Sequence, residues 1–196
     1  NINQKLAAKH ELIVNGSPTY TEENKTPLYI AAEIEQLEIV ELLLKNKNID
    51  VNGESLCAIF SEELEGQLIG NKTPLQISIE KQNIEIIKCL LNQENIVINM
   101  LIEMSLEKKF FYKKTLLHIA IEKENEKIVE LLLSNNINQF IDYNVTKINR
   151  VLDARSYNKY KYIEIKTSLQ LAIQYKNIKI VELLLKKEKN INKLDL

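Results

Sequence analysis

Side chains able to carry out chemistry are few in this chain of 196 residues. It contains 2 His, 2 Cys and 4 Gly, and it lacks the spacings of a phosphate-binding loop, a zinc-protease helix or a serine-hydrolase turn. His10 stands alone, and Cys57 and Cys89 have neither a CxxC spacing nor a neighbouring His cluster. No catalytic pair can be singled out among the many glutamates. We therefore expect no enzymatic activity, no cofactor and no metal site.

The composition is that of an ordinary globular domain, with 45% hydrophobic and 27% charged residues and a net charge of −1. No apolar run of 18 residues occurs, and residues 1–14 lack the features of a secretory signal. We expect an intracellular, cytoplasmic protein with reduced cysteines. The net charge hides an asymmetry, because residues 1–95 contain 8 Lys and 15 Asp/Glu, whereas residues 96–196 contain 18 Lys/Arg and 12 Asp/Glu.

One phrase occurs four times, and its anchors are Thr26, Thr73, Thr115 and Thr167. In each copy a Leu follows two positions later, a small residue five positions later and an apolar pair 13 and 14 positions later. This spacing predicts two short amphipathic helices per copy. Helices this short are marginal alone, so their stability must come from stacking the copies. The helix pairs are expected at about 26–46, 73–93, 115–135 and 167–187.

The copies open with TPLYIAA (Thr26 to Ala32), TPL (Thr73 to Leu75) and TLLHIA (Thr115 to Ala120), and their tails read IDVN, IVIN and NIN. In these residues the chain resembles the ankyrin repeat family. The resemblance implies a mainly α-helical solenoid with β-hairpin fingers, and a non-catalytic protein-interaction scaffold as function. It also implies a structural hydrogen-bonding role for His118. Cys89 occupies a slot that is Leu in the other copies, so we expect a buried thiol.

The copies divide a single domain, 1–196, into repeats at 1–48, 49–95, 96–138 and 139–189, with a further repeat beginning at 190–196. The opening triplet NIN at residue 1 matches the triplet at residue 190. We expect an excerpt of a longer array, with a natural terminus as the alternative. Whether the chain acts within a larger enzyme, as its targeting or regulatory part, stays open.

Two departures from the family pattern carry structural consequences. The turn glycine is replaced by Glu35, Gln82, Glu124 and Lys176, and if the backbone still needs a positive φ there, each costs ~1 kcal/mol. The anchors are 47, 42 and 52 residues apart, against about 33 in the family, so we expect long fingers. The first has an Asn15-Gly16 hairpin signal, and a short helix over Ser61 to Gln67 is the alternative to a second hairpin.

The resemblance implies that a partner contacts the finger bases and the outward side of each first helix. Ile34 and Tyr175 are apolar at such positions and are the sharper candidates, against the alternative of scattered surface apolarity. A different hypothesis is that fingers three and four, which are basic and rich in Tyr, bind an anion or nucleic acid. The candidate binding residues are Lys25, Glu33, Ile34, Lys72, Glu80, Lys81, Lys114, Glu122, Lys123, Tyr160, Tyr162, Lys166, Gln174 and Tyr175.

Overall fold

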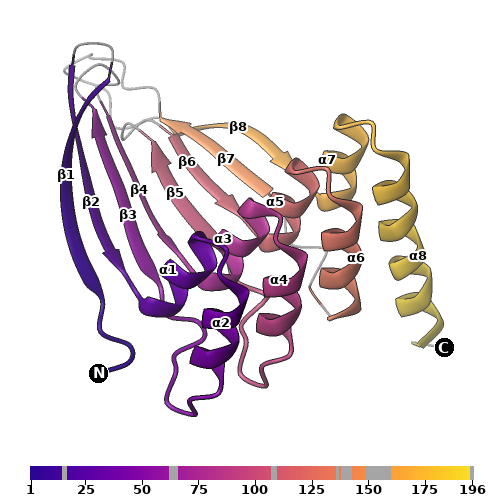
Figure 1. Cartoon of the computed structure of the whole chain (residues 1–196). Helices are drawn as coiled ribbons and strands as arrows, with labels where there is room; N and C mark the ends of the chain where they lie inside the picture. Colours follow the sequence, from indigo (N-terminus) through magenta and orange to yellow (C-terminus); the bar gives the residue numbers. More distant parts are fainter. Residues whose placement is uncertain are drawn as a thin grey trace.

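The computed structural model describes residues 1–14, 17–61, 66–106, 110–135, 137, 143–148 and 160–194. Its helices form two parallel rows, and its strands rise from the inner row as one sheet (Figure 1). The two ends of the chain lie at opposite ends of the stack. None of the described helices is long and apolar enough to cross a membrane.

Each copy forms the predicted pair of short helices. The anchor threonine caps the first helix of every copy, because its Oγ1 accepts the amide of the residue three positions later, as Thr26 does from Tyr29 at 3.2 Å. The inner helices are α1 (Pro27–Glu33), α3 (Pro74–Lys81), α5 (Leu116–Glu122) and α7 (Ser168–Gln174). The outer helices are α2 (Leu37–Leu44), α4 (Ile84–Leu91), α6 (Glu126–Ser134) and α8 (Ile178–Leu194).

The turn between paired helices takes the left-handed conformation without glycine. Glu35, Gln82, Glu124 and Lys176 have φ of 60°, 60°, 52° and 56°, which confirms the conditional expectation of a positive φ. In the first copy, the Glu35 amide donates to Ala32 and the Gln36 amide to Ala31, the pattern of a Schellman cap. In the other three copies an asparagine follows the left-handed residue and caps the second helix; Asn83 Oδ1, for example, accepts the Ile86 amide at 3.2 Å. Gln36 in the first copy makes no such side-chain cap.

The segments between copies are antiparallel hairpins, as predicted. Val14 pairs with Ser17 across the first finger, while Asn15 and Gly16 themselves lie outside the described residues. The alternative of a helix over 61–67 is wrong for its described part, because Ser61 and Gly66 pair as strand residues. The strands are β1 (Leu6–Val14), β2 (Ser17–Lys25), β3 (Ser55–Ser61), β4 (Gly66–Lys72), β5 (Ile102–Leu106), β6 (Phe110–Lys114), β7 (Tyr143–Ile148) and β8 (Tyr160–Lys166).

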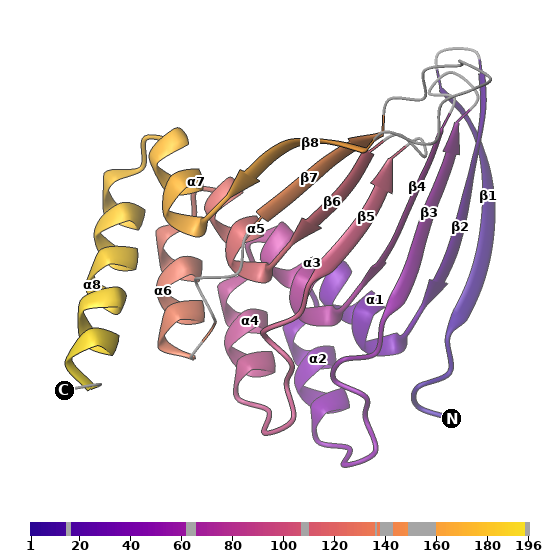
Figure 2. The same ribbon diagram turned by 180° about the vertical axis from the view of Figure 1, so that it is seen from behind.

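The fingers also pair with one another, so the eight strands form one sheet in sequence order (Figure 2). Near the finger bases, the strand register is the same in every copy. The residue three positions before one anchor threonine lies at the same level of the sheet as the residue three positions before the next anchor threonine. Thus Glu23 and Gly70 both pair with Cys57, and Tyr112 and Glu164 both pair with Val145. The sheet and the helix rows therefore advance together, one copy at a time.

Tails of neighbouring copies are joined by asparagine side chains. Asn52 Nδ2 donates to the Asn95 carbonyl at 2.8 Å, and its Oδ1 accepts the Val97 amide at 2.8 Å. Asn3 makes the same two contacts with the Asn48 carbonyl and the Asp50 amide, at 2.8 and 2.9 Å. Each asparagine thus provides hydrogen-bond partners for backbone groups in a loop that forms no regular backbone hydrogen bonds of its own.

The last copy differs from the prediction at its end. We expected its second helix to stop near residue 187, but α8 continues to Leu194. The extension, residues 188–194, contains neither Gly nor Pro to stop it, and two Lys, one Glu and one Leu among its seven residues are strong helix formers.

Candidate interaction surface

Most finger-base lysines are ion-paired within their own copy. Lys25 Nζ lies 2.8 Å from Glu33 Oε2, Lys72 Nζ 2.6 Å from Glu80 Oε2, and Lys114 Nζ 2.6 Å from Glu122 Oε2. In the fourth copy Lys166 donates to the amide oxygen of Gln174. Each pair ties the last residue of a strand to the end of the following inner helix.

This pairing separates the candidate residues into two groups. The paired side chains are half-buried in the first three copies, with exposures of 13 to 28%, so they support the surface rather than project from it. Sequence reasoning placed them at the surface but missed the pairing. A signal existed: a Lys one position before the anchor recurs with a Glu seven positions after it in three copies.

The exposed members of the candidate set lie where the inner helices end. Ile34 is 54% and Tyr175 38% exposed, and Lys81 and Lys123 are exposed at the equivalent positions. Figure 1 shows the turns after α5 and α7 on the side toward which the strands rise. We call the four residues Ile34, Lys81, Lys123 and Tyr175 the turn row. Burial and the nearby carboxylates of Glu122 and Glu124 raise the pKa of Tyr175, so its hydroxyl stays protonated at neutral pH.

Tyr160 and Tyr162 belong to β8, where their backbones are level with Ile148 and Thr146. Their side chains, and Lys159 before them, lie outside the described residues. The interpretation of this finger as a stacking platform for anions or bases remains a prediction.

His118 is fully buried and has the structural role that the resemblance implied. Its Nδ1 accepts the Thr115 amide at 3.2 Å and lies 2.8 Å from Thr115 Oγ1, while Nε2 lies 3.4 Å from Ser168 Oγ in the next copy. An accepting Nδ1 places the proton on Nε2, so the ring is neutral. Burial, and next the positive charge of Lys114, lower its pKa from 6.5 to about 4.

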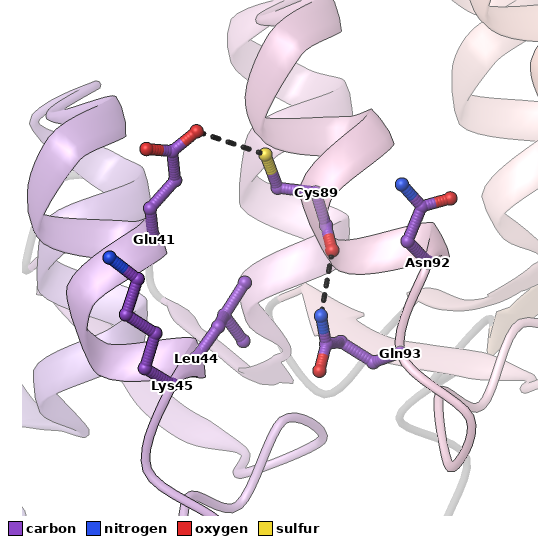
Figure 3. Close-up of a pocket in the computed structure, with 6 residues that line it drawn as sticks. All are labelled: Glu41, Leu44, Lys45, Cys89, Asn92 and Gln93. Carbon is purple, nitrogen blue, oxygen red and sulfur yellow. Dashed lines mark hydrogen bonds between the residues drawn. The ribbon is translucent and has the colours of Figure 1, made fainter.

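Cys89 is half-buried rather than buried, contrary to expectation. It lines a shallow groove between α2 and α4 with Glu41, Leu44, Lys45, Asn92 and Gln93 (Figure 3). The Sγ atom points toward Glu41 Oε1 at 3.9 Å. The position of Cys89 faces the preceding copy, where Glu41 makes a polar contact with the thiol. Apolar side chains alone therefore do not enclose Cys89. Burial and Glu41 raise the pKa of the thiol, which disfavours the reactive thiolate.

The described part of the chain holds no cluster of three or more His, Cys, Asp or Glu residues able to bind a metal ion. Cys57 lies in β3, and its side chain is outside the described residues. The described surface presents a repeated pattern of exposed side chains along the stack of helices.

Comparison with known protein families gives the same result along most of the chain. A family model described as "Ankyrin repeats (3 copies)" matches residues 55–147. A model of the single ankyrin repeat matches residues 23–54 and 166–196. No curated protein matches the chain. Ankyrin repeats generally mediate protein–protein interaction, and these matches span the four copies: the chain belongs to the ankyrin repeat family.

Proposed function

We propose that the chain is a non-catalytic module that holds a protein partner in the angle between the sheet and the inner helices. The observation that carries the proposal is the turn row. It comprises one exposed residue per copy, each directly after or at the end of an inner helix, and its two end members are the apolar Ile34 and Tyr175. Large apolar and aromatic side chains at regular spacing are what a protein interface uses as anchors.

The surroundings of the turn row favour a preorganised surface. The Lys–Glu pairs fix the strand ends against the inner helices at 2.6 to 2.8 Å. A partner then orders few side chains of this chain on binding, and the entropic cost of association is lower. The partner we propose is a folded or extended protein segment that presents apolar groups toward Ile34 and Tyr175 and carboxylates toward Lys81 and Lys123.

The test is a comparative pull-down with the purified chain as bait. We expect Ile34→Arg/Tyr175→Ala to reduce recovery of the specific partner at least tenfold, because two exposed anchors are lost. Val97→Arg is the matched control: Val97 is 49% exposed and lies in a tail loop. Equal recovery by the wild type and the double variant would contradict the proposal. Recovery that depends on added nucleic acid, and falls steeply with salt, would favour the basic fingers instead.

A further inference from the structure

The turn row repeats once per copy, and the fold fixes the length of that repeat. Every copy adds two strands to one sheet, in which all neighbouring strands are antiparallel. Neighbouring strands lie about 4.8 Å apart, so each copy advances the sheet by about 9.6 Å. The inner helices of successive copies also pack on one another, and packed helices lie about 8 to 10 Å apart. Both spacings place successive turn-row residues about 9.6 Å apart.

Side-chain hydrogen bonds hold consecutive turns together at this spacing. Asn83 Nδ2 donates to Glu35 Oε2 of the preceding copy at 3.2 Å, and Asn125 Nδ2 donates to Gln82 Oε1 at 2.9 Å. Glu35 and Gln82 each directly follow a member of the turn row in the chain. The spacing is therefore fixed beside the turn row itself, as well as in the sheet.

A partner that contacts one turn-row residue per copy needs a repeat of the same length. Side chains on one face of a β-strand recur every two residues, which is about 6.8 Å and too short. In an α-helix the matching repeat is seven residues, or about 10.5 Å, which leads the turn row by about 2.7 Å after three copies. A polyproline II segment repeats every three residues, or about 9.3 Å, and differs by only about 0.9 Å after three copies.

Lys81 and Lys123 determine the chemistry of the two central contacts. Both side chains are exposed, and neither forms an ion pair with another residue that the structure describes, whereas the finger-base lysines of the same two copies are paired. A carboxylate opposite each lysine therefore meets a positive charge that no carboxylate of this chain already neutralises at close range. At the two outer contacts the apolar Ile34 and Tyr175 suit apolar groups, and aromatic side chains commonly contact polyproline II segments.

We propose that the turn row binds an extended segment of the partner in the polyproline II conformation, with contact residues at i, i+3, i+6 and i+9. The first and last contact residues are apolar, and the two central ones are acidic. This inference rests on the proposed function, since it names the conformation and pattern of the partner segment. Such a segment has little conformational freedom to lose on binding, because its conformation already exists in the free chain.

Fluorescence anisotropy with three labelled decapeptides tests the proposal. LPPEPPEPPL carries the proposed pattern. LPEPEPLPPP has the same composition but places its contact residues at every second position, and LPPKPPKPPL keeps the spacing and reverses the charge. The wild-type chain should bind LPPEPPEPPL, and should bind the other two about tenfold more weakly, because at least two contacts are lost.

A charge exchange on the protein gives the sharper test. Lys81→Glu/Lys123→Glu changes two exposed residues, so the variant should fold as the wild type does, which circular dichroism checks. It should lose LPPEPPEPPL and bind LPPKPPKPPL instead. Lys47→Glu/Lys127→Glu is the matched control, because it makes the same change of charge at two exposed lysines outside the turn row, and it should keep the preference of the wild type.

Three results would overturn the inference. They are equal binding of LPPEPPEPPL and LPEPEPLPPP by the wild type, no binding of LPPEPPEPPL at millimolar concentration, and an unchanged preference in Lys81→Glu/Lys123→Glu.

Failure of this inference is separable from failure of the proposed function. If Ile34→Arg/Tyr175→Ala loses the partner while LPPEPPEPPL neither binds nor competes with it, the inference is wrong and the proposed function stands. If the double variant recovers the partner as the wild type does, both are wrong. Competition between LPPEPPEPPL and the recovered partner is the result that we expect.

Discussion

At the scale of single residues, the chain keeps strained backbone at each helix turn. Asn83 Nδ2 donates to Glu35 Oε2 of the preceding copy at 3.2 Å, and Asn125 Nδ2 donates to Gln82 Oε1 at 2.9 Å. A long polar side chain at a left-handed position thus serves as a link between copies, which glycine could not provide. These bonds are exposed, so they offset only part of the strain.

Lys176 in the fourth copy has the same left-handed conformation, with a φ of 56°. We predict that Lys176→Gly stabilises the fold by ~1 kcal/mol. Lys176→Ala retains the Cβ and should show no such gain. Urea denaturation measures both, and equal stability of the Gly and Ala variants would contradict the strain account. Gln82→Gly should gain less, since it also loses the bond from Asn125.

His118 predicts a pH dependence of stability. Its pKa is about 4 in the folded chain, and about 6.5 in an unfolded one. The stability that the neutral His118 ring contributes to the fold is therefore complete above pH 6.5. It is lost as the pH falls toward 4, because the histidine takes up a proton in the unfolded state before it does so in the folded state. The difference amounts to roughly 3 kcal/mol at 1.36 kcal/mol per pH unit.

The matched variant is His118→Gln, since Gln170 makes the equivalent cap in the fourth copy, with its Oε1 accepting the Thr167 amide at 3.0 Å. Unfolding free energies measured at pH 7.5, 5.5 and 4.5 should fall more steeply for the wild type than for the variant. Parallel curves would show that the ring is not neutral and buried in the way described.

At the scale of elements, the tails depend on asparagine. Asn52→Ala should lower the free energy of unfolding by ~2 kcal/mol, because it leaves the Asn95 carbonyl and the Val97 amide without their partner. Asn92→Ala is the control, since Asn92 is exposed and caps no loop between copies. Hydrogen exchange at the Val97 amide should accelerate in the first variant only. A loss of stability without faster exchange of the Val97 amide would show that Asn52 does not stabilise the chain through this loop.

The helices could be predicted from the sequence and the sheet only in part. Every helix pair follows from the anchor threonine and the spacing of apolar residues, since both act within one copy. Hairpins followed from the excess length between copies. The pairing between neighbouring fingers could not be predicted. Strands β4 and β5 meet through backbone groups, such as those of Ile69 and Ser105, and the finger sequences share no pattern that reveals this contact.

The candidate surface shows the same division. The exposure of the turn row could be predicted, because Ile34 and Tyr175 are apolar at a position where the other two copies have lysine. The ion pairs were not, because Lys72 and Glu80 lie eight residues apart on a strand and a helix whose relative orientation only the fold determines. Cys89 was placed in the correct slot, but its exposure depends on Glu41 in another copy.

At the scale of the whole molecule, the packing contacts between copies are distributed along one axis. Each helix pair packs on its neighbours, α1 on α3 and α5 on α7, so the stack is a row of nearest-neighbour contacts. The turn row, which is the proposed partner surface, runs along one side of the stack.

Hydrogen–deuterium exchange, with and without the partner recovered by the wild type, tests the central claim most directly. The account predicts slower exchange on binding in the sheet and at the ends of the inner helices, around residues 33–36, 80–83, 122–125 and 174–177. The outer helices should exchange at unchanged rates, because they lie on the other side of the stack. Protection confined to α2, α4, α6 and α8 would contradict the account.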